Sequence, residues 1–556
     1  MTSTLYHNGT IHSSADPFAE AVLVADGQIA WIGAQDFIGK VADGADEVVD
    51  LDGALVTPAF VDAHVHVLET GFALSSIDLS PEGGVRSLTR LLEAVGAAAG
   101  RARTEGRTAP LLGHGWDETT WPERRPPTAA ELDRATGGAP VYLARADVHS
   151  AVVSSSFAEV ARCRGLPGWS DDGLVRLEAH HAARAAAREV TPARRDELYR
   201  LSLGAAAAAG IASVHEHSAP SIDTREGLAT LLATTADPLS GLPLVVGYRG
   251  ELCETTDDAR ALLEAIPGLS GIGGDLNVDG SIGSRTAALR APYQDLPNGS
   301  PEALGRLALS AEQVANHVAA VTRAGVQAAF HVIGDRGMDE VLLGIRAATE
   351  VEGVGAVRGS VHRLEHAEML DARALATLVL LGLTVSAQPA FDSRWGGPDR
   401  MYAQRLGAGR AASLNPLADL AGAGVPLAFG SDAPVTPLDP WAAVRAAISH
   451  HEPSQRISAR AAFRAHTRGG WRAARLDHTG AGEIRLGAPA SIAIWATERL
   501  TVQAPEGRLS AWSPDARAGI PLLPELSDDV PPPVCLRTLR EGVVIHDTWD
   551  RPSVTG

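Results

Sequence analysis

The stretch TPAFVDAHVH, residues 57–66, carries the pattern around which the fold of this 556-residue chain is organised. It has the pattern of a short apolar strand that ends in His64 and His66. Because side chains alternate between the two faces of a strand, both imidazoles point the same way. Two imidazoles at one strand end can bind a divalent metal ion, although this spacing alone is equally compatible with two ordinary histidines.

From residue 58 to about residue 481, apolar strand-like runs alternate with Ala- and Leu-rich helical runs. The strand-like runs include residues 211–215, 327–331, 360–366, 383–388 and 426–430, and the helical runs include residues 198–209, 311–324 and 371–381. Alternation of this kind predicts a parallel sheet. About eight such units, with polar residues at the carboxyl ends of the strands, predict an α/β fold with a (β/α)8 TIM-like barrel.

The amino-terminal segment has the pattern of short β-strands, with Asp26-Gly27 as a hairpin turn. A segment of this size cannot bury a core of its own. We therefore expect it to pair with the strand-like runs 491–495 and 542–546 from the other end of the chain. The predicted small β-sandwich domain comprises residues 1–57 and 482–556.

Residues from about 75 to about 172 fit the alternation less well and contain a Pro- and Arg-rich bend at 121–127. We interpret this region as an insertion into the barrel domain, residues 58–481, that lies over the barrel mouth. Two roles remain open for it: a lid that closes over the substrate, or an addition that stabilises the fold.

Composition excludes several classes of function. The formal net charge of -19 argues against a nucleic-acid or membrane partner, because phosphates are bound by clusters of Lys and Arg. The three cysteines lie far apart, which predicts neither a disulfide framework nor a thiolate zinc site. No signal-peptide pattern and no apolar run of about 18 residues is present. We expect a cytoplasmic enzyme with a small-molecule substrate, and a homodimer remains one alternative for its oligomeric state.

Further candidate metal ligands stand where apolar strands give way to loops: His331, His366 and Asp432. In a barrel all these strand ends face one mouth, so the three side chains are expected beside His64 and His66. Imidazole and carboxylate donors without sulfur favour zinc, and manganese or iron less specifically. Each residue alone is compatible with a hydrogen-bonded core position, but the set of five predicts a metal centre.

A metal centre of this kind predicts hydrolysis. A bound zinc ion lowers the pKa of its water from about 15.7 towards about 7 and polarises a carbonyl group above it. A neighbouring carboxylate can take the proton of the water and pass it to the leaving group. Asp432 is the candidate for both metal ligation and this general base and acid role.

Aromatic and arginine side chains are candidates for the substrate pocket. The aromatic candidates, which would suit an apolar or aromatic substituent, are Trp116, Trp121, Phe391, Trp395 and Trp441. Arg285 and Arg405 could bind a carboxylate or a carbonyl oxygen. Ordinary packing and surface salt bridges are the alternatives for these residues.

The ordered motifs resemble the amidohydrolase superfamily, and within it the branch that contains N-substituted formamide deformylases. The resemblance spans nearly the whole chain and rests on residues 25–29, 58–66, 115–118, 279–287, 331–335, 365–367, 386–389, 430–435 and 482–491. It implies that His64, His66 and Asp432 hold the more buried metal ion. It also implies that His331 and His366 hold a second ion.

The family usually bridges its two ions with a carboxylated lysine shortly before the Asp-Gly-Ser motif, here residues 279–281. Asp275 occupies that position, and the only lysine of the chain, Lys40, lies in the predicted small domain, so such a bridge is excluded. Three interpretations remain. Asp275 bridges two ions, or it ligates one ion of a mononuclear site, or the second site is vestigial and His331 and His366 bind substrate or stabilise an oxyanion. We favour a metal site that includes Asp275, because a carboxylate keeps the charge of the missing bridge.

The sequence therefore predicts a metal-dependent hydrolase that cleaves an amide or formamide-like C–N bond by metal-activated hydroxide. A deaminase, or a hydrolase of cyclic amides or esters, is the alternative within the same superfamily. A hydrolytically inactive metal-binding barrel, acting as a binding protein or an isomerase, is the alternative from another class. The substrate is not identified, because specificity in such barrels lies in the loops.

Overall fold

The computed structural model describes residues 3–297, 299–503, 512–513 and 521–549. Eight parallel strands form one sheet in the order β7-β13-β14-β15-β16-β17-β18-β19, which confirms the predicted barrel. The two outer strands meet at the mouth, where the N–H of Asp432 donates to the carbonyl of His64 at 2.8 Å. The N–H of His66 donates in turn to the carbonyl of Ala433 at 3.0 Å.

The barrel strands are short, and β7 is buried over its whole length, as expected for a strand covered on both faces. Their bounds are β7 Phe60–Val65, β13 Ile211–Ser218, β14 Leu244–Arg249, β15 Leu269–Ile272, β16 Gln327–Val332, β17 Arg363–His366, β18 Thr384–Ala387 and β19 Leu427–Phe429. The helices that surround them include α7 Pro192–Ala208, α8 Arg225–Ala236, α9 Thr256–Ala265, α10 Ala311–Arg323, α11 Asp335–Glu352, α13 Ala372–Leu381 and α18 Pro440–Ile448. Several begin at a Thr, Ser or Asp whose side chain caps the first turn, as Ser310 does for α10.

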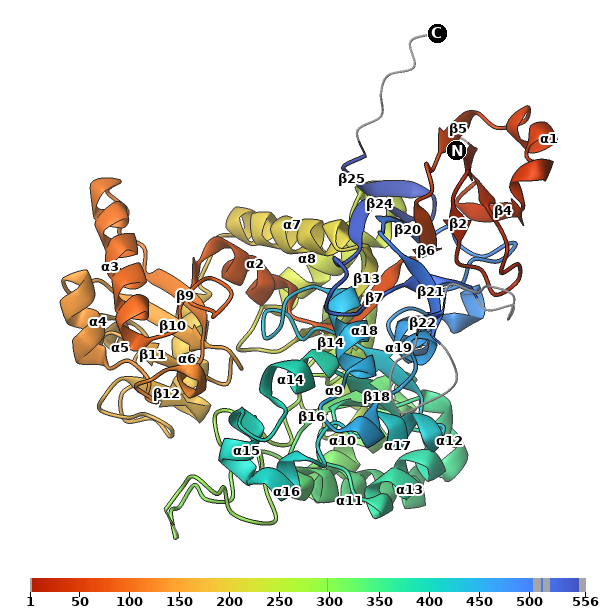
Figure 1. Ribbon diagram of the computed structural model, residues 1–556. Coiled ribbons are helices and arrows are strands. Elements are labelled where there is room, and N and C mark those ends of the chain that lie inside the picture. Colours follow the sequence, from red (N-terminus) through yellow and green to blue (C-terminus); the bar gives the residue numbers. More distant parts are fainter. Residues whose placement is uncertain (1–2, 298, 504–511, 514–520, 550–556) are drawn as a thin grey trace.

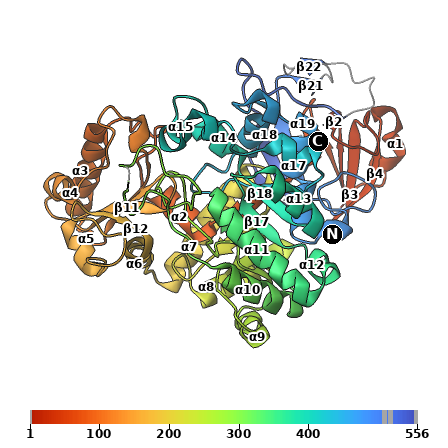
Figure 2. The same cartoon turned by 90° about the horizontal axis from the view of Figure 1, so that it is seen from below.

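Strands from the two ends of the chain lie side by side (Figures 1 and 2, red and blue). The predicted strand around residues 491–495 is β20 (Ile492–Ala496), which pairs antiparallel with β6 (Leu55–Pro58). The other predicted strand is β25 (Val543–Asp547), which pairs with β24 (Val534–Arg540) in the same sheet. A second sheet, in the order β4-β3-β1-β5, holds β1 (Thr4–His7), β3 (Ala21–Ala25), β4 (Gln28–Gly33) and β5 (Glu47–Asp50).

The region predicted as an insertion forms a five-stranded sheet of its own, in the order β12-β11-β10-β9-β8. Its strands are β8 Ile77–Asp78, β9 Leu111–Trp116, β10 Val141–Arg145, β11 Ser150–Val153 and β12 Leu174–Arg176, and its helices are α3 Leu88–Thr104, α4 Ala129–Thr136, α5 Ser155–Val160 and α6 Leu177–Ala187. Trp116 and Trp121 are buried in its apolar core. The helix α6 extends this unit beyond residue 172, and the unit lies at the side of the barrel away from the terminal strands (Figures 1 and 2).

No helix among the described residues is both long enough and apolar enough to cross a membrane.

Candidate metal centre

Two imidazoles at the end of β7 are each fixed by a hydrogen bond on Nδ1. Nδ1 of His64 lies 2.9 Å from Oε2 of Glu365. Nδ1 of His66 lies 2.9 Å from the carbonyl oxygen of His217. Because both partners only accept, each Nδ1 carries a proton, and Nε2 is the nitrogen of each ring that a metal ion could bind.

Two further imidazoles, at the ends of β16 and β17, are fixed in the same way. Nδ1 of His366 donates to the side-chain oxygen of Gln388 at 2.8 Å. Nε2 of His331 donates to the carbonyl oxygen of Gly280 at 3.4 Å. All four histidines therefore turn their second ring nitrogen to the centre, and a metal ion would bind that nitrogen in its unprotonated form.

Two carboxylates lie among these nitrogens. Oδ1 of Asp432 is 3.0 Å from Nε2 of His66 and 3.5 Å from Nε2 of His64. Oδ2 of Asp275 lies 3.6 Å from Nε2 of His66. Its Oδ1 lies 3.6 Å from Nε2 of His64 and 4.0 Å from Nδ1 of His331. Ligands about 2.0–2.2 Å from a tetrahedral ion are separated by about 3.3 Å, so these spacings suit metal ligation.

The backbone explains how the two carboxylates reach this point. Gly274 has φ of +83°, and a Cβ there would lie 2.1 Å from Nδ1 of His217, so glycine is required for the turn that presents Asp275. Asp432 has φ of +55° and is held by its hydrogen bond to the carbonyl of His64.

Three buried polar atoms at the centre make no well-directed hydrogen bond within the described part of the chain: Nε2 of His64, Nε2 of His366 and Oδ1 of Asp432. Buried lone pairs without a donor are costly. A divalent cation would satisfy all three atoms. Two groups of residues have possible ligand atoms close enough together to hold such a cation: His64–His66–Asp275 and His64–His366–Asp432. The residues present therefore fit a metal ion.

The charges of the centre are strongly coupled. Burial alone lowers the pKa of His64, but Asp432, Asp275 and Glu365 outweigh it and raise the pKa to about 10. Burial lowers the pKa of His331 to about 4. Burial opposes ionisation of Asp275, yet the neighbouring imidazoles hold the pKa of its carboxyl well below the usual range. The site thus carries concentrated negative charge, which favours a bound cation.

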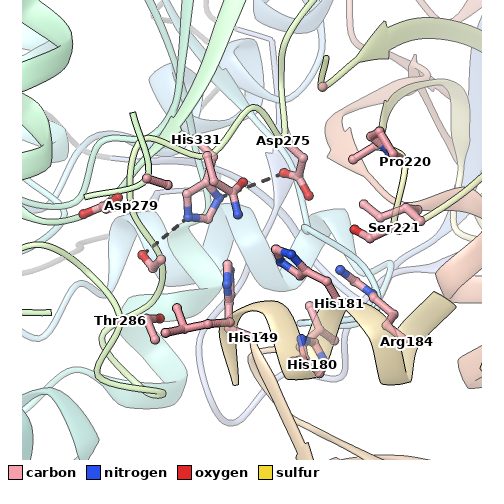
Figure 3. A pocket seen from close by; sticks show the side chains of 18 of the residues that line it. His149, His180, His181, Arg184, Pro220, Ser221, Asp275, Asp279, Thr286 and His331 are labelled. Atoms are coloured by element: carbon pink, nitrogen blue, oxygen red, sulfur yellow. Dashed lines mark hydrogen bonds and ion pairs between the residues drawn. The ribbon is translucent and has the colours of Figure 1, made fainter. Parts of the chain in front are cut away.

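A cavity of about 620 Å³ opens above the centre. Its floor belongs to the barrel and includes His66, Asp275, His331, His366 and Asp432. Its roof belongs to the inserted unit and includes three residues of α6. Figure 3 shows His149, His180, His181 and Arg184 on the side opposite Asp275 and His331. Sequence patterns gave no indication of these four roof residues, because an insertion carries no signal for the surface it will cover.

The roof is tied to the barrel by buried polar contacts. Arg145 of the insertion pairs with Asp147 at 3.1 Å. Ser281 and Ser284 belong to the loop after β15, and both donate a hydrogen bond to Oδ2 of Asp147 at 2.7 Å. Arg405, from the segment after β18, pairs with Glu118 of the insertion at 2.7 Å.

The four residues predicted to bind substrate lie in different places. Trp395 lines a narrow space of about 20 Å³ beside His331, His366 and Asp432. Trp116 is fully buried and donates to the carbonyl of Leu143 at 2.9 Å. Trp116, Arg285 and Arg405 line a separate cavity, where both arginines pair with Asp295. A role in binding substrate stays a prediction for all four.

Comparison with known proteins decides the family. A model of the amidohydrolase family matches residues 47–546. The chain belongs to the amidohydrolase family. This amidohydrolase is 28% identical over 516 residues to the protein LONG AFTER FAR-RED 3 of Arabidopsis thaliana, covering 86% of this chain and 84% of that protein. It is 27% identical over 489 residues to YtcJ of Bacillus subtilis (strain 168), named as an amidohydrolase, covering 81% of this chain and 84% of that one.

The amidohydrolase also matches an N-substituted formamide deformylase of Arthrobacter pascens, with 31% identity over 142 residues that cover 25% of each chain. A solved structure, described as an uncharacterized metal-dependent hydrolase from Pyrococcus furiosus, is similar with a TM-score of 0.67 and 26% identity over 88% of this chain and 98% of that one. The predicted superfamily and barrel fold are thus confirmed. The chain is a metal-dependent hydrolase of the amidohydrolase type, an enzyme class that acts on carbon–nitrogen bonds other than peptide bonds.

Proposed function

We propose that this amidohydrolase cleaves the C–N bond of an amide or a formamide-like substrate. One observation carries the proposal: in the described residues, buried atoms of His64, His366 and Asp432 that make no well-directed hydrogen bond meet beneath a cavity of about 620 Å³. A metal site at the bottom of a cavity large enough for a substrate is the arrangement that hydrolysis of a carbonyl compound requires. The partial similarity to a formamide deformylase supports the choice of bond.

We propose zinc as the metal ion, because imidazole and carboxylate donors without sulfur suit it. His64, His66 and Asp432 would hold one ion, and His331 and His366 would hold a second. When bound, a divalent ion makes water more acidic and polarises a carbonyl group. Asp275 lies within 4.0 Å of imidazoles from both groups, and we propose it as a ligand in place of the family's carboxylated lysine.

Asp432 would move the proton. Within the described part of the chain its Oδ1 makes no well-directed hydrogen bond, and Asp432 lines the cavity floor, so this oxygen can accept a proton from the attacking water. The same carboxyl would then deliver this proton to the substrate nitrogen as the C–N bond breaks. The products are a carboxylic acid, or formic acid, and an amine.

The test is turnover of N-substituted formamides and acyl amides by purified protein, with zinc, with manganese and after treatment with a chelator. Release of amine that depends on metal supports the proposal. Release of ammonia from an amino-substituted ring would favour the deaminase alternative. Tight metal binding without turnover of any amide, cyclic amide or ester would favour the inactive barrel.

A further inference from the structure

The roof of the cavity carries a positive charge on Arg184 that is only partly neutralised. Arg184 extends from α6 towards the cavity, and only 7% of its surface is exposed. Its one carboxylate partner among the described residues is Glu69, at 3.3 Å from Nε. The Nη2 atom of Arg184 is buried and has no hydrogen-bond partner in that part of the chain.

Glu69 also forms an ion pair with a second arginine, Arg188. Nε of Arg188 lies 2.7 Å from Oε1 of Glu69, and Nη2 of Arg188 contacts Oε2. Two guanidinium groups therefore share one carboxylate, which leaves one positive charge in excess beside the cavity. A buried charge without a counter-charge is unfavourable, so this arrangement favours an anion next to Arg184.

None of the carboxylates that line the cavity, Glu178, Asp275, Asp279 and Asp432, forms an ion pair with Arg184 in the described residues. Asp275 is engaged with His64 and His66 at 3.6 Å, and no ion pair links it to Arg184 in the described residues. The second arginine that lines the cavity, Arg306, is paired with Glu178 at 3.0 Å and carries no excess charge.

The neighbours of Arg184 on the roof add hydrogen-bonding groups and no charge of their own. Burial and the nearby charge of Arg184 hold the pKa of His180 well below its usual value and lower that of His181. Both imidazoles are therefore neutral at pH 7. The roof thus offers one guanidinium fork among neutral rings, and this fork matches the two oxygens of a carboxylate.

We propose that Arg184 binds a carboxylate of the substrate, so that the enzyme prefers amides whose acyl or amine part carries an acid group. The inference rests on the proposed function, because it places the scissile C–N bond over the centre formed by His64, His66 and Asp432. The acid group would lie under α6 while the amide lies on the barrel floor.

The first experiment compares matched substrates that differ only in charge, N-formylphenylalanine and its neutral carboxamide. We expect the wild-type enzyme to have the higher kcat/KM for the acid. Arg184→Met should lower kcat/KM for the acid by about 10- to 100-fold and change that for the carboxamide by less than about threefold. Arg184→Lys should restore part of the preference, because it keeps the charge and loses the fork. Arg306→Met, in the same cavity, should keep the preference.

The second experiment measures binding and does not need turnover. Calorimetry with 3-phenylpropionate and 3-phenylpropionamide should show about 10-fold or more weaker binding of the acid to Arg184→Met than to the wild type, and equal binding of the amide. Equal binding of the acid by both proteins, or an unchanged acid preference in Arg184→Met, would overturn the role of Arg184. If neither member of the substrate pair is hydrolysed while the binding difference stands, the proposed amide hydrolysis fails and the carboxylate site does not.

Discussion

Oε2 of Glu365 lies 2.9 Å from Nδ1 of His64, and the two residues come from β17 and β7, which are not neighbours in the barrel sheet. Glu365 is itself held by Arg363, whose Nε lies 2.9 Å from Oε1. This pairing fixes which nitrogen of His64 is protonated and turns the other one towards Asp275 and Asp432. The ring is also stacked on His217, with centroids 4.0 Å apart.

Glu365→Gln should weaken metal binding about 10- to 100-fold, because an amide orients the His64 ring less strongly and makes it a poorer donor. Competition with a coloured chelator would measure the affinity. Glu352→Gln, which changes a carboxylate paired with Arg323 on the outside of the barrel, is the matched control and should bind metal like the wild type. Equal affinity in all three proteins would show that Glu365 does not support the centre.

Asp432→Asn should lower kcat by about 10²- to 10⁴-fold, because an amide cannot carry the proton from water to the leaving nitrogen. Steady-state amine release gives the rate, and thermal unfolding checks that the protein remains folded. A variant with more than a tenth of the wild-type kcat would remove Asp432 from the proposed proton transfer.

Asp275→Ala tests how many ions the centre holds. If Asp275 is shared by two ions, the wild type should contain about two metal ions per chain and the variant fewer, as measured by elemental analysis of the purified proteins. One ion per chain in both proteins would rule out a binuclear centre bridged by Asp275.

Glu69 should make the stability of the protein depend on pH in the acidic range. Burial raises the pKa of this carboxyl, but Arg184 and Arg188 outweigh it and lower the pKa from 4.5 to about 2. A carboxyl with a lowered folded-state pKa stabilises the fold above its unfolded value and loses this contribution as pH falls from about 4.5 to about 2. The contribution is roughly 3 kcal/mol.

Glu69→Gln should therefore lower the free energy of unfolding at pH 7 by about 3–5 kcal/mol and reduce its decrease between pH 5 and pH 3. Chemical denaturation at several pH values would measure both effects. Glu178→Gln is the control, because its pair with Arg306 is exposed and contributes less than about 1 kcal/mol. An identical pH dependence in Glu69→Gln and wild type would contradict the role of Glu69.

The barrel floor could be predicted from sequence because its signal is local. His64 and His66 alternate along one strand, and His331, His366 and Asp432 each follow an apolar run, so barrel geometry alone brings them together. Asp275 was predicted only through the resemblance to the amidohydrolase superfamily, from its position before the Asp-Gly-Ser motif. Supporting contacts such as that from His366 to Gln388 had no separate signal, although Gln388 stands directly after β18.

The roof could not be predicted, because its position depends on contacts between distant segments. Arg184 lies on a helix whose pattern of small apolar residues indicates only that one face is buried. Arg285 and Arg405 have the residue type expected of an anion site, yet both are paired with Asp295. Whether a guanidinium is paired or in excess is a property of the folded structure and is absent from the one-dimensional pattern.

The separate origin of floor and roof has a consequence for how this enzyme could change. The proposed metal ligands lie on barrel strands or in the loops that follow them, whereas α6 belongs to the inserted unit, which has an apolar core of its own. If Arg184 binds the substrate as proposed, substitutions on the cavity side of α6 should alter which molecules are accepted and leave the proposed metal ligands in place. The inserted sheet is therefore the natural region for directed evolution towards new substrates, with the barrel strands held constant.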